Sequence, residues 1–266
     1  MMERDQVAVY IDEGAVFEDL LCEVAREMDH DRARLRPVMA EDILAPRDPW
    51  DRTLCLIVPG GADGPYCAAL NGEGNDRIRA FVAGGGRYLG ICAGAYYACR
   101  EIAFHAGRAD AVVGQRDLAL LAARAIGSLD DLAPPYDRTL ASAAAVRLDW
   151  PGLGVFRGHY HGGPRFEIDP GAAITVLARF GDVPGCPPAV VQASLGQGMV
   201  VACSVHLEQC GATLEARLPS LCDGETHRAL AWALGSDETL RRRAFRQILA
   251  LCRVPLKPWA GDRAAA

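Results

Sequence analysis

The sequence contains no long apolar run and no excess of basic residues. No stretch approaches the roughly 18 uninterrupted apolar residues that a membrane-spanning helix requires. The formal net charge is −6 at pH 7, and no basic stripe offsets it. We therefore expect neither a membrane nor a nucleic acid as a partner.

The amino terminus also lacks the features of a secretion signal. Residues 1–6 carry no basic n-region, and the apolar run Val7–Ile11 that follows them is too short for the apolar core of a signal peptide. We therefore expect a cytoplasmic protein.

Cysteine is frequent, but its placement argues against a disulfide framework. The ten cysteines include no CxxC pair and no Cys/His cluster with zinc spacing. Cys55 and Cys203 lie in apolar strand patterns, whereas Cys22, Cys99 and Cys252 lie in helical patterns. Free cysteine in such positions behaves as a small buried hydrophobe. We expect free thiols, no bound metal and no organic cofactor.

The order of hydrophobic patterns predicts an α/β fold. Strand and helix patterns alternate, which favours a mostly parallel sheet with helices on both faces. A β-rich excursion is expected between Ser142 and Val191. No repeat or linker divides the chain, so residues 1–266 are predicted to form a single domain. Strands are expected at Val7–Ile11, Leu35–Met39, Leu54–Val58, Arg87–Ile91 and Met199–Ser204. Helices are expected at Phe17–Met28, Asn75–Ala83, Leu118–Ala125 and Cys222–Leu251, and a helix or turn at Glu41–Leu44.

Local features add detail to this outline. Asn75 is suited to cap the helix that it begins, and Gly84 to supply a left-handed residue after its end. The run Gly84–Gly86 follows a helix instead of opening one, so we interpret it as a loop and not as a phosphate cradle. The basic run Arg241–Arg243 is interpreted as a solvated helix face.

The most informative local pattern surrounds Cys92. An apolar strand runs into Gly90-Ile91-Cys92-Ala93-Gly94, and a helical pattern follows. This is the cysteine version of a nucleophile elbow, in which glycines two residues before and after relieve backbone crowding. The thiol would lie at the carboxyl end of a strand and at a helix N-terminus, where the thiolate is stabilised. Alone, the pattern also fits an ordinary buried strand-to-helix turn.

A nucleophilic thiol needs a base and a group that orients the base. Of the six histidines, only His206 follows a convincing buried strand and precedes a carboxylate, Glu208, by two residues. Strands of one parallel sheet end at the same edge, so His206 is expected to reach Cys92. A surface histidine beside a surface glutamate is the alternative.

A third element is the turn Pro59-Gly60-Gly61 after the strand Leu54–Val58. Backbone N–H groups in such a turn can bind a developing oxyanion, with the N–H of Ala93 as a second donor. A plain turn explains these residues equally well.

In this order the motifs resemble the class I glutamine amidotransferases, which have a flavodoxin-like fold. They are similar, more narrowly, to the amidotransferase-like N-terminal domain of long eukaryotic biotin–protein ligases and its free-standing bacterial relatives. The resemblance spans about Val7 to Cys210. It rests on Tyr10–Gly14, Pro59–Asp63, Tyr66, Leu70–Gly72, Gly85–Tyr96, His161–Pro164 and His206–Glu208.

The resemblance implies roles for these residues. Cys92 would be the nucleophile, His206 the general base and Glu208 its orienting group. The oxyanion and substrate pocket would be formed by Gly60, Gly61, Ala93, His161, Gly162 and Gly163. Leu207 replaces the proline that amidotransferases usually have there. The sequence contains no synthetase domain and no glycine- and arginine-rich biotinyl-adenylate loop, so ligase activity is not expected of it.

Three functional hypotheses follow. The first is a thiol-dependent amide hydrolase or amidotransferase subunit that acts on a small-molecule amide, with a separate acceptor or synthetase protein as a conceivable partner. The second is a non-catalytic module that retains the pocket and binds a ligand or a partner. The third is a ThiJ/PfpI-type protein, in which Glu13 or Glu18 would approach Cys92, although that family usually has histidine where Ala93 stands.

Overall fold

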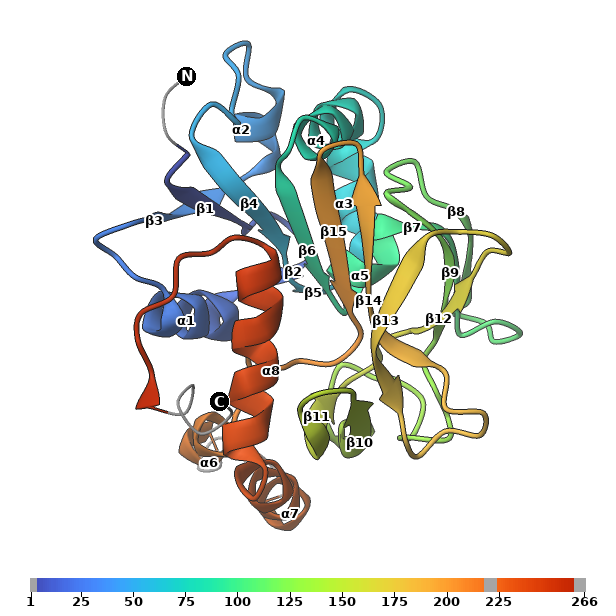
Figure 1. Cartoon of the computed structure of the whole chain (residues 1–266). Helices are drawn as coiled ribbons and strands as arrows, with labels where there is room; N and C mark the ends of the chain where they lie inside the picture. Colours follow the sequence, from blue (N-terminus) through green and yellow to red (C-terminus); the bar gives the residue numbers. More distant parts are fainter. Residues whose placement is uncertain (1–3, 218–223, 261–266) are drawn as a thin grey trace.

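A nine-stranded mixed sheet organises the chain in the computed structural model, which describes residues 4–217 and 224–260 (Figure 1). One half of the sheet is parallel and the other half antiparallel. The strand order is β11 (Gly154–Tyr160), β10 (Ala144–Trp150), β13 (Ile174–Phe180), β14 (Pro188–Leu195), β15 (Gly198–Cys203), β6 (Arg87–Ile91), β4 (Thr53–Val58), β1 (Gln6–Tyr10) and β3 (Arg34–Val38). The strands from β15 to β3 form the parallel half, and the antiparallel half contains the predicted β-rich excursion.

Both faces of the sheet are covered by helices, as the sequence predicts (Figure 1). Successive strand residues point to opposite faces, so each strand feeds two apolar layers. Val7 and Val9 pack on the side of α1 (Glu18–Glu27) and α8 (Glu238–Leu251). Ala8 and Tyr10 pack on the other side, which is covered by α2 (Ala40–Leu44), α3 (Asp63–Leu70), α4 (Glu73–Ala83) and α5 (Ala93–Ala98).

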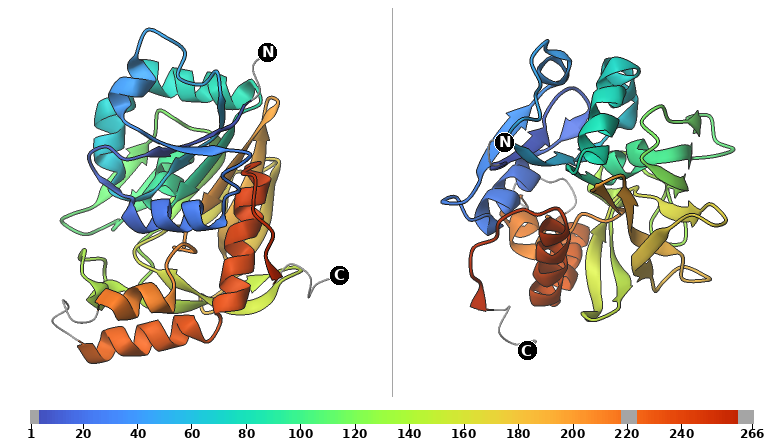
Figure 2. Two further views of the ribbon diagram at one scale, coloured as in Figure 1. Left: turned by 90° about the vertical axis from the view of Figure 1, so that its left-hand side faces the viewer. Right: turned by 45° about the horizontal axis from the view of Figure 1, so that its top comes forward.

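Smaller elements surround this core. A second sheet has the order β12 (Arg165–Ile168), β9 (Leu121–Gly127), β7 (Cys99–Phe104) and β8 (Val112–Gln115). The short strands β2 (Ala15–Val16) and β5 (Gly60–Gly61) pair with each other, and a 3-10 turn, η1, covers Leu140–Ser142. Helices α6 (Gly211–Arg217) and α7 (Gly224–Gly235) pack against the start of β10 (Figure 2).

The prediction of a helix over Leu118–Ala125 is wrong. These residues enter β9, where burial alternates along Leu121–Gly127. The many alanines favour a helix locally, but pairing with β7 and β12 decides the outcome, because propensity is weaker than tertiary context. Cys99, also expected in a helix, begins β7.

The expected caps of α4 are wrong as well. The helix begins at Glu73, so Asn75 lies within it, buried and hydrogen-bonded to Asp117 at 2.8 Å. The left-handed residue after the helix is Gly85, with φ 104°, because Gly84 still has φ −78°.

The basic run Arg241–Arg243 is not a solvated face. Arg241 is fully buried, and its guanidinium donates hydrogen bonds to Glu238 and to the carbonyl oxygen of Leu207. Arg242 donates to Glu27 at 2.6 Å, so the run ties α8 to the rest of the fold. The predicted helix Cys222–Leu251 is divided into α7 and α8, and Cys222 and Asp223 lie outside the described residues.

Free thiols are found at the nine cysteines that the structure describes. Over residues 4–217 and 224–260, no helix combines the length and apolar character needed to cross a membrane.

Candidate active site

Cys92 lies in a strained turn between β6 and α5. Its backbone has φ 48° and ψ −103°, a conformation that residues other than glycine rarely adopt. The turn is possible because glycine flanks it. A Cβ on Gly90 would lie 2.3 Å from the carbonyl oxygen of Gly94, and one on Gly94 would lie 2.1 Å from that of Val58. The geometry is that of a nucleophile elbow, as the sequence predicts.

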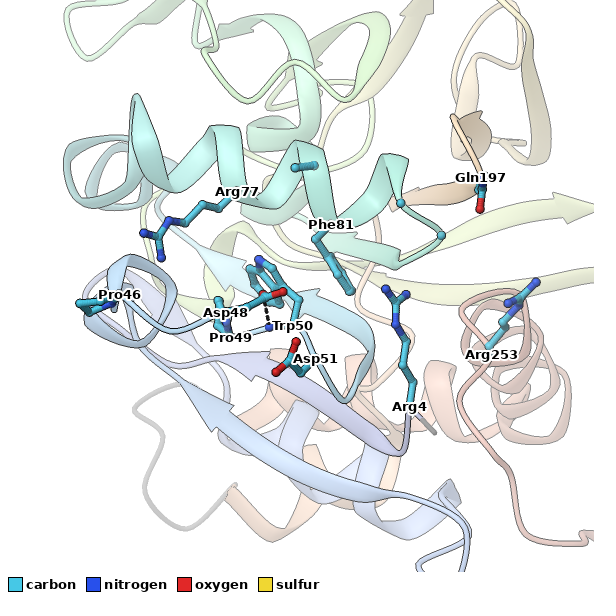
Figure 3. A pocket seen from close by; sticks show the side chains of 13 residues that line it. Arg4, Pro46, Asp48, Pro49, Trp50, Asp51, Arg77, Phe81, Gln197 and Arg253 are labelled. Atoms are coloured by element: carbon cyan, nitrogen blue, oxygen red, sulfur yellow. Dashed lines mark hydrogen bonds between the residues drawn. The ribbon is translucent and has the colours of Figure 1, made fainter. Parts of the chain in front are cut away.

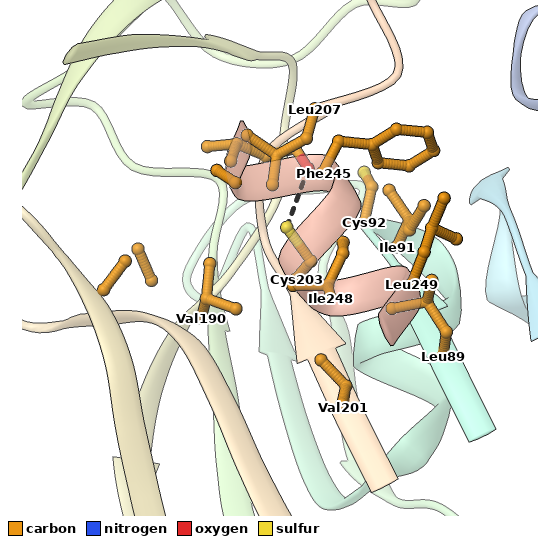
Figure 4. Packing of buried hydrophobic residues seen from close by; sticks show 14 of the residues in the cluster. Leu89, Ile91, Cys92, Val190, Val201, Cys203, Leu207, Phe245, Ile248 and Leu249 are labelled. Carbon is orange, nitrogen blue, oxygen red and sulfur yellow. Dashed lines mark hydrogen bonds between the residues drawn. The ribbon is translucent and has the colours of Figure 1, made fainter. Parts of the chain in front are cut away.

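The thiol of Cys92 is largely enclosed. Only 6% of the residue is exposed, and it belongs to the apolar cluster that includes Ile91, Leu207 and Phe245 (Figure 4). Its Sγ lies 3.5 Å from the carbonyl oxygen of His161. An enclosed sulfur is screened from water, which strengthens its interactions with charged neighbours.

His206 and Glu208 complete the constellation beside Cys92. The Nδ1 atom of His206 donates to Oε1 of Glu208 at 2.7 Å, and the carboxylate is almost fully buried. Burial alone would lower the pKa of His206. The Glu208 carboxylate and a hydrogen bond with Cys92 outweigh it and hold that pKa well above its ordinary value. The arrangement therefore favours an imidazolium beside the sulfur.

Gly60 marks the point where the nucleophile and the histidine meet. A Cβ placed on Gly60 would lie 2.5 Å from Cε1 of His206, and 3.4 Å from both Nε2 of His206 and Cβ of Cys92. Only glycine leaves room for this approach. Gly61 pairs with Ala15 in the β2–β5 ribbon, and Ala93 is the first residue of α5. The N–H of a first helical residue has no partner within its helix.

The loop that carries His206 is fixed from two sides. The backbone N–H of His206 donates to the carbonyl oxygen of His159 at 2.8 Å. The carbonyl oxygen of Leu207 accepts a hydrogen bond from Arg241 on α8. Leu207, which stands where the resemblance implies proline, is fully buried and therefore serves the core.

His161 lies beside the constellation but is held differently. Its Nε2 lies 3.0 Å from the carbonyl oxygen of Thr139 and 3.2 Å from Oγ of Ser142. Burial, and then the charge of His206, lower the pKa of His161 to about 4. The carbonyl oxygen of the neighbouring Gly162 accepts a hydrogen bond from Tyr96 at 3.0 Å. Gly163 follows, against the backbone of Ser204.

Four tyrosines lie near Cys92, and sequence reasoning singled out two of them, Tyr66 and Tyr96, without giving them a place at the site. Burial first, and then the charge of Cys92 among other neighbours, raise the pKa of each. Nothing in the local sequence marks Tyr136, whose ring lies 4.8 Å from that of His161. The four residues are Tyr66, Tyr96, Tyr136 and Tyr160.

Neither the glutamates of the ThiJ/PfpI alternative nor a set of metal ligands surrounds the thiol in the described residues. Glu13 and Glu18, which a ThiJ/PfpI-type protein would direct at the thiol, are both exposed, whereas Cys92 is buried. Within the described ranges, no three His, Cys, Asp or Glu side chains gather closely enough to hold a metal ion.

Comparison with known proteins gives the relationship of the chain. The family model described as "Biotin-protein ligase, N terminal" matches residues 5–260. The chain belongs to this family. The match covers the whole constellation, from the strand before Gly60 to Glu208.

Two curated relatives share part of the sequence. An uncharacterised protein of Chlamydia muridarum is 38% identical over 163 residues, which cover 60% of this chain and 62% of that protein. The biotin–protein ligase of Schizosaccharomyces pombe is 29% identical over 168 residues, which cover 61% of this chain but 27% of the ligase. The matched part is therefore less than two thirds of either relative.

Solved structures show the same fold. A glutamine amidotransferase crystal structure superposes with a TM-score of 0.58 at 22% identity, covering 93% of this chain and 99% of that one. A second, from Thermotoga maritima, gives a TM-score of 0.56 at 12% identity, covering 94% and 99%. The class I amidotransferase type of α/β fold predicted from the sequence is thereby confirmed.

Proposed function

We propose that the chain is a thiol-dependent amide hydrolase or amidotransferase-like enzyme. The observation that carries the proposal is the placement of His206 between Cys92 and the buried carboxylate of Glu208. The raised pKa of His206, caused by the Glu208 carboxylate and a hydrogen bond with Cys92, supports a proton donor beside the sulfur.

The reaction would proceed in two steps. In the first, the Sγ of Cys92 attacks the amide carbonyl carbon, and the Nε2–H of His206 protonates the departing amine, which leaves a thioester. In the second, His206 takes a proton from water and the hydroxide attacks the thioester, so that the carboxylic acid departs and the thiolate of Cys92 is restored beside protonated His206. The N–H groups of Ala93 and Gly61 would stabilise the oxyanion in both steps.

The substrate class in this proposal is a small-molecule amide, with glutamine as the first compound to assay. Solved amidotransferases of the same fold suggest this starting point, although fold alone does not determine substrate. The released ammonia could be passed to a separate acceptor or synthetase protein. We place the enzyme in the cytoplasm and assign no biotin ligation to these residues.

A non-catalytic binding module is the second candidate, and one observation favours it. Cys92 is only 6% exposed, so a substrate carbonyl would have to enter a site that is nearly closed. In that case the constellation would hold a ligand or a partner without turning it over.

Hydrolysis of glutamine and a panel of small amides, followed as ammonia release, distinguishes the two candidates. We expect release by the wild type that falls below detection in Cys92→Ala, with Cys22→Ala, a change at an exposed thiol, as the matched control. Release that survives Cys92→Ala, or no release from any amide, would contradict the enzyme. Incubation with biotin and ATP should leave an acceptor peptide unmodified.

A further inference from the structure

A second pocket lies at the opposite end of the parallel strands from Cys92. It has a volume of about 1210 Å³ and opens between α4 and the loops that precede β1, β4, β6 and β15 (Figure 3). Strand β6 connects the two ends, because Arg87 begins it and Cys92 follows it. A strand of this length separates the two sites by on the order of 17 Å.

Arginine dominates one side of this pocket. Arg4 and Arg253 line it, and Figure 3 shows Arg4 directed toward Phe81 on α4 and Arg253 on the same side of the pocket as Gln197. Arg4 lies over the ring of Phe81 at 5.6 Å. Arg87 begins β6 at this end of the sheet, and the charges of Arg253 and Arg4 both act on its guanidinium, which donates to the carbonyl oxygen of Gln197 at 3.2 Å. Two guanidinium groups therefore line one side of the pocket, and a third cation lies near enough for their charges to act on it.

No carboxylate neutralises these three arginines within the part of the chain that the structure describes. Arg77, on the far side of the pocket, differs, since it pairs with Glu73 at 2.6 Å. The pocket also contains Asp51 and Asp48, and Asp48 accepts a hydrogen bond from the backbone N–H of Trp50 at 2.8 Å. Neither aspartate forms an ion pair with Arg4, Arg87 or Arg253 in the described residues.

Buried donors at this end also lack acceptors. Arg87 is 6% exposed, and its Nε–H has no partner among the described residues. Trp50, which lines the pocket, is also 6% exposed, and its indole N–H likewise has no acceptor among the described residues. A buried charge or donor without a partner is costly, and a bound anion would remove that cost.

Arg253 occupies a position that would suit glycine better. It follows the end of α8 with φ 58°, and the N–H of Val254 closes the turn onto the carbonyl oxygen of Leu249 at 3.0 Å. Glycine is the usual residue at this left-handed position. An arginine held there at the cost of backbone strain is explained if its guanidinium has a ligand.

We propose that this pocket binds a phosphorylated small molecule, with its phosphate groups held by Arg4 and Arg253 and attracted also by the charge of Arg87. Arginine suits this role because its planar fork can donate two hydrogen bonds to one phosphate. The site is distinct from the Cys92 constellation and does not depend on the proposed amide chemistry.

Calorimetric titration with inorganic pyrophosphate tests this site, with sodium chloride at matched ionic strength as the reference. We expect saturable one-to-one binding by the wild type that Arg4→Gln and Arg253→Gly each weaken by about tenfold or more. Arg157→Gln is the matched control, because Arg157 is an exposed arginine on β11 outside the pocket. It should bind like the wild type.

Thermal unfolding without pyrophosphate separates binding from folding. Arg253→Gly relieves the left-handed strain, so its Tm should be unchanged or about 2 °C higher even though it binds less. No binding beyond the salt reference, equal binding by the two pocket variants and the wild type, or equal weakening in Arg157→Gln would overturn the proposal.

Discussion

The two ends of the parallel half-sheet differ in whether their buried charges have a partner of opposite charge. At the carboxyl end, His206 is matched by Glu208 at 2.7 Å and by Cys92, so each charge has a buried partner. At the amino end, burial and the nearby charge of Arg253 lower the pKa of Arg87, with no carboxylate beside it in the described residues. The charges at the carboxyl end neutralise one another within the protein. In our proposal, the arginines at the amino end are neutralised only when an anionic ligand is bound.

Removing the negative charge of Glu208 at the carboxyl end should have the largest effect, which is a loss of amide turnover. Glu208→Gln keeps a hydrogen-bond acceptor for His206 but removes the charge that raises its pKa. We expect amide turnover to fall by about 10²- to 10⁴-fold, in line with losses of the orienting carboxylate in other triads. Steady-state assays should show this in kcat/KM, and Glu18→Gln, at an exposed position, should behave like the wild type.

His161 gives a smaller, pH-dependent effect at the same end. Its pKa of about 4 lies below the ordinary value near 6.5, so the unfolded chain binds the proton more readily. The stability due to neutral His161 is therefore present above pH 6.5 and is lost as pH falls toward 4, by roughly 3 kcal/mol at most.

Urea unfolding at several pH values between 6.5 and 4.5 measures this loss. His161→Gln should flatten the pH dependence relative to the wild type in that window, because glutamine does not titrate. Parallel curves for the two proteins would show that His161 is not held neutral by its surroundings.

The smallest effect is expected at the amino end of the parallel strands, for the free energy of unfolding of an Arg87 variant. Arg87→Met removes a buried charge that has no carboxylate, and costs only hydrogen bonds such as the one to Gln197 at 3.2 Å. Replacing such a group with an apolar one is often neutral. The free energy of unfolding should change by about 1 kcal/mol or less in chemical denaturation, and a loss of about 3 kcal/mol would show that the charge is satisfied.

The sequence predicted that Cys92, His206 and Glu208 lie together, but it did not predict the contacts that hold them in place. The strand before Cys92 and the glycines around it indicate the nucleophile elbow, because backbone crowding restricts those positions to glycine. His206 and Glu208 were found from their place after a buried strand. These signals are local, so they survive without knowledge of the fold.

What the sequence did not reveal depends on contacts between distant segments. Arg241 belongs to a basic run that resembles a solvated face, and only the fold brings it to Leu207. Tyr136 approaches His161 from a segment without regular structure. The alanines of β9 favour a helix until two neighbouring strands pair with them.

The most direct test of the central claim is the alkylation rate of each cysteine by iodoacetamide as a function of pH, followed by peptide mass spectrometry. An ordinary thiol, with a pKa of about 8.5, reacts slowly at pH 6.5, whereas a thiolate paired with an imidazolium does not. If His206 activates Cys92, Cys92 should label at pH 6.5 faster than the exposed Cys22 and Cys186 despite its burial, and His206→Ala should abolish the difference. Labelling of Cys92 no faster than that of Cys22, or unchanged by His206→Ala, would contradict the account.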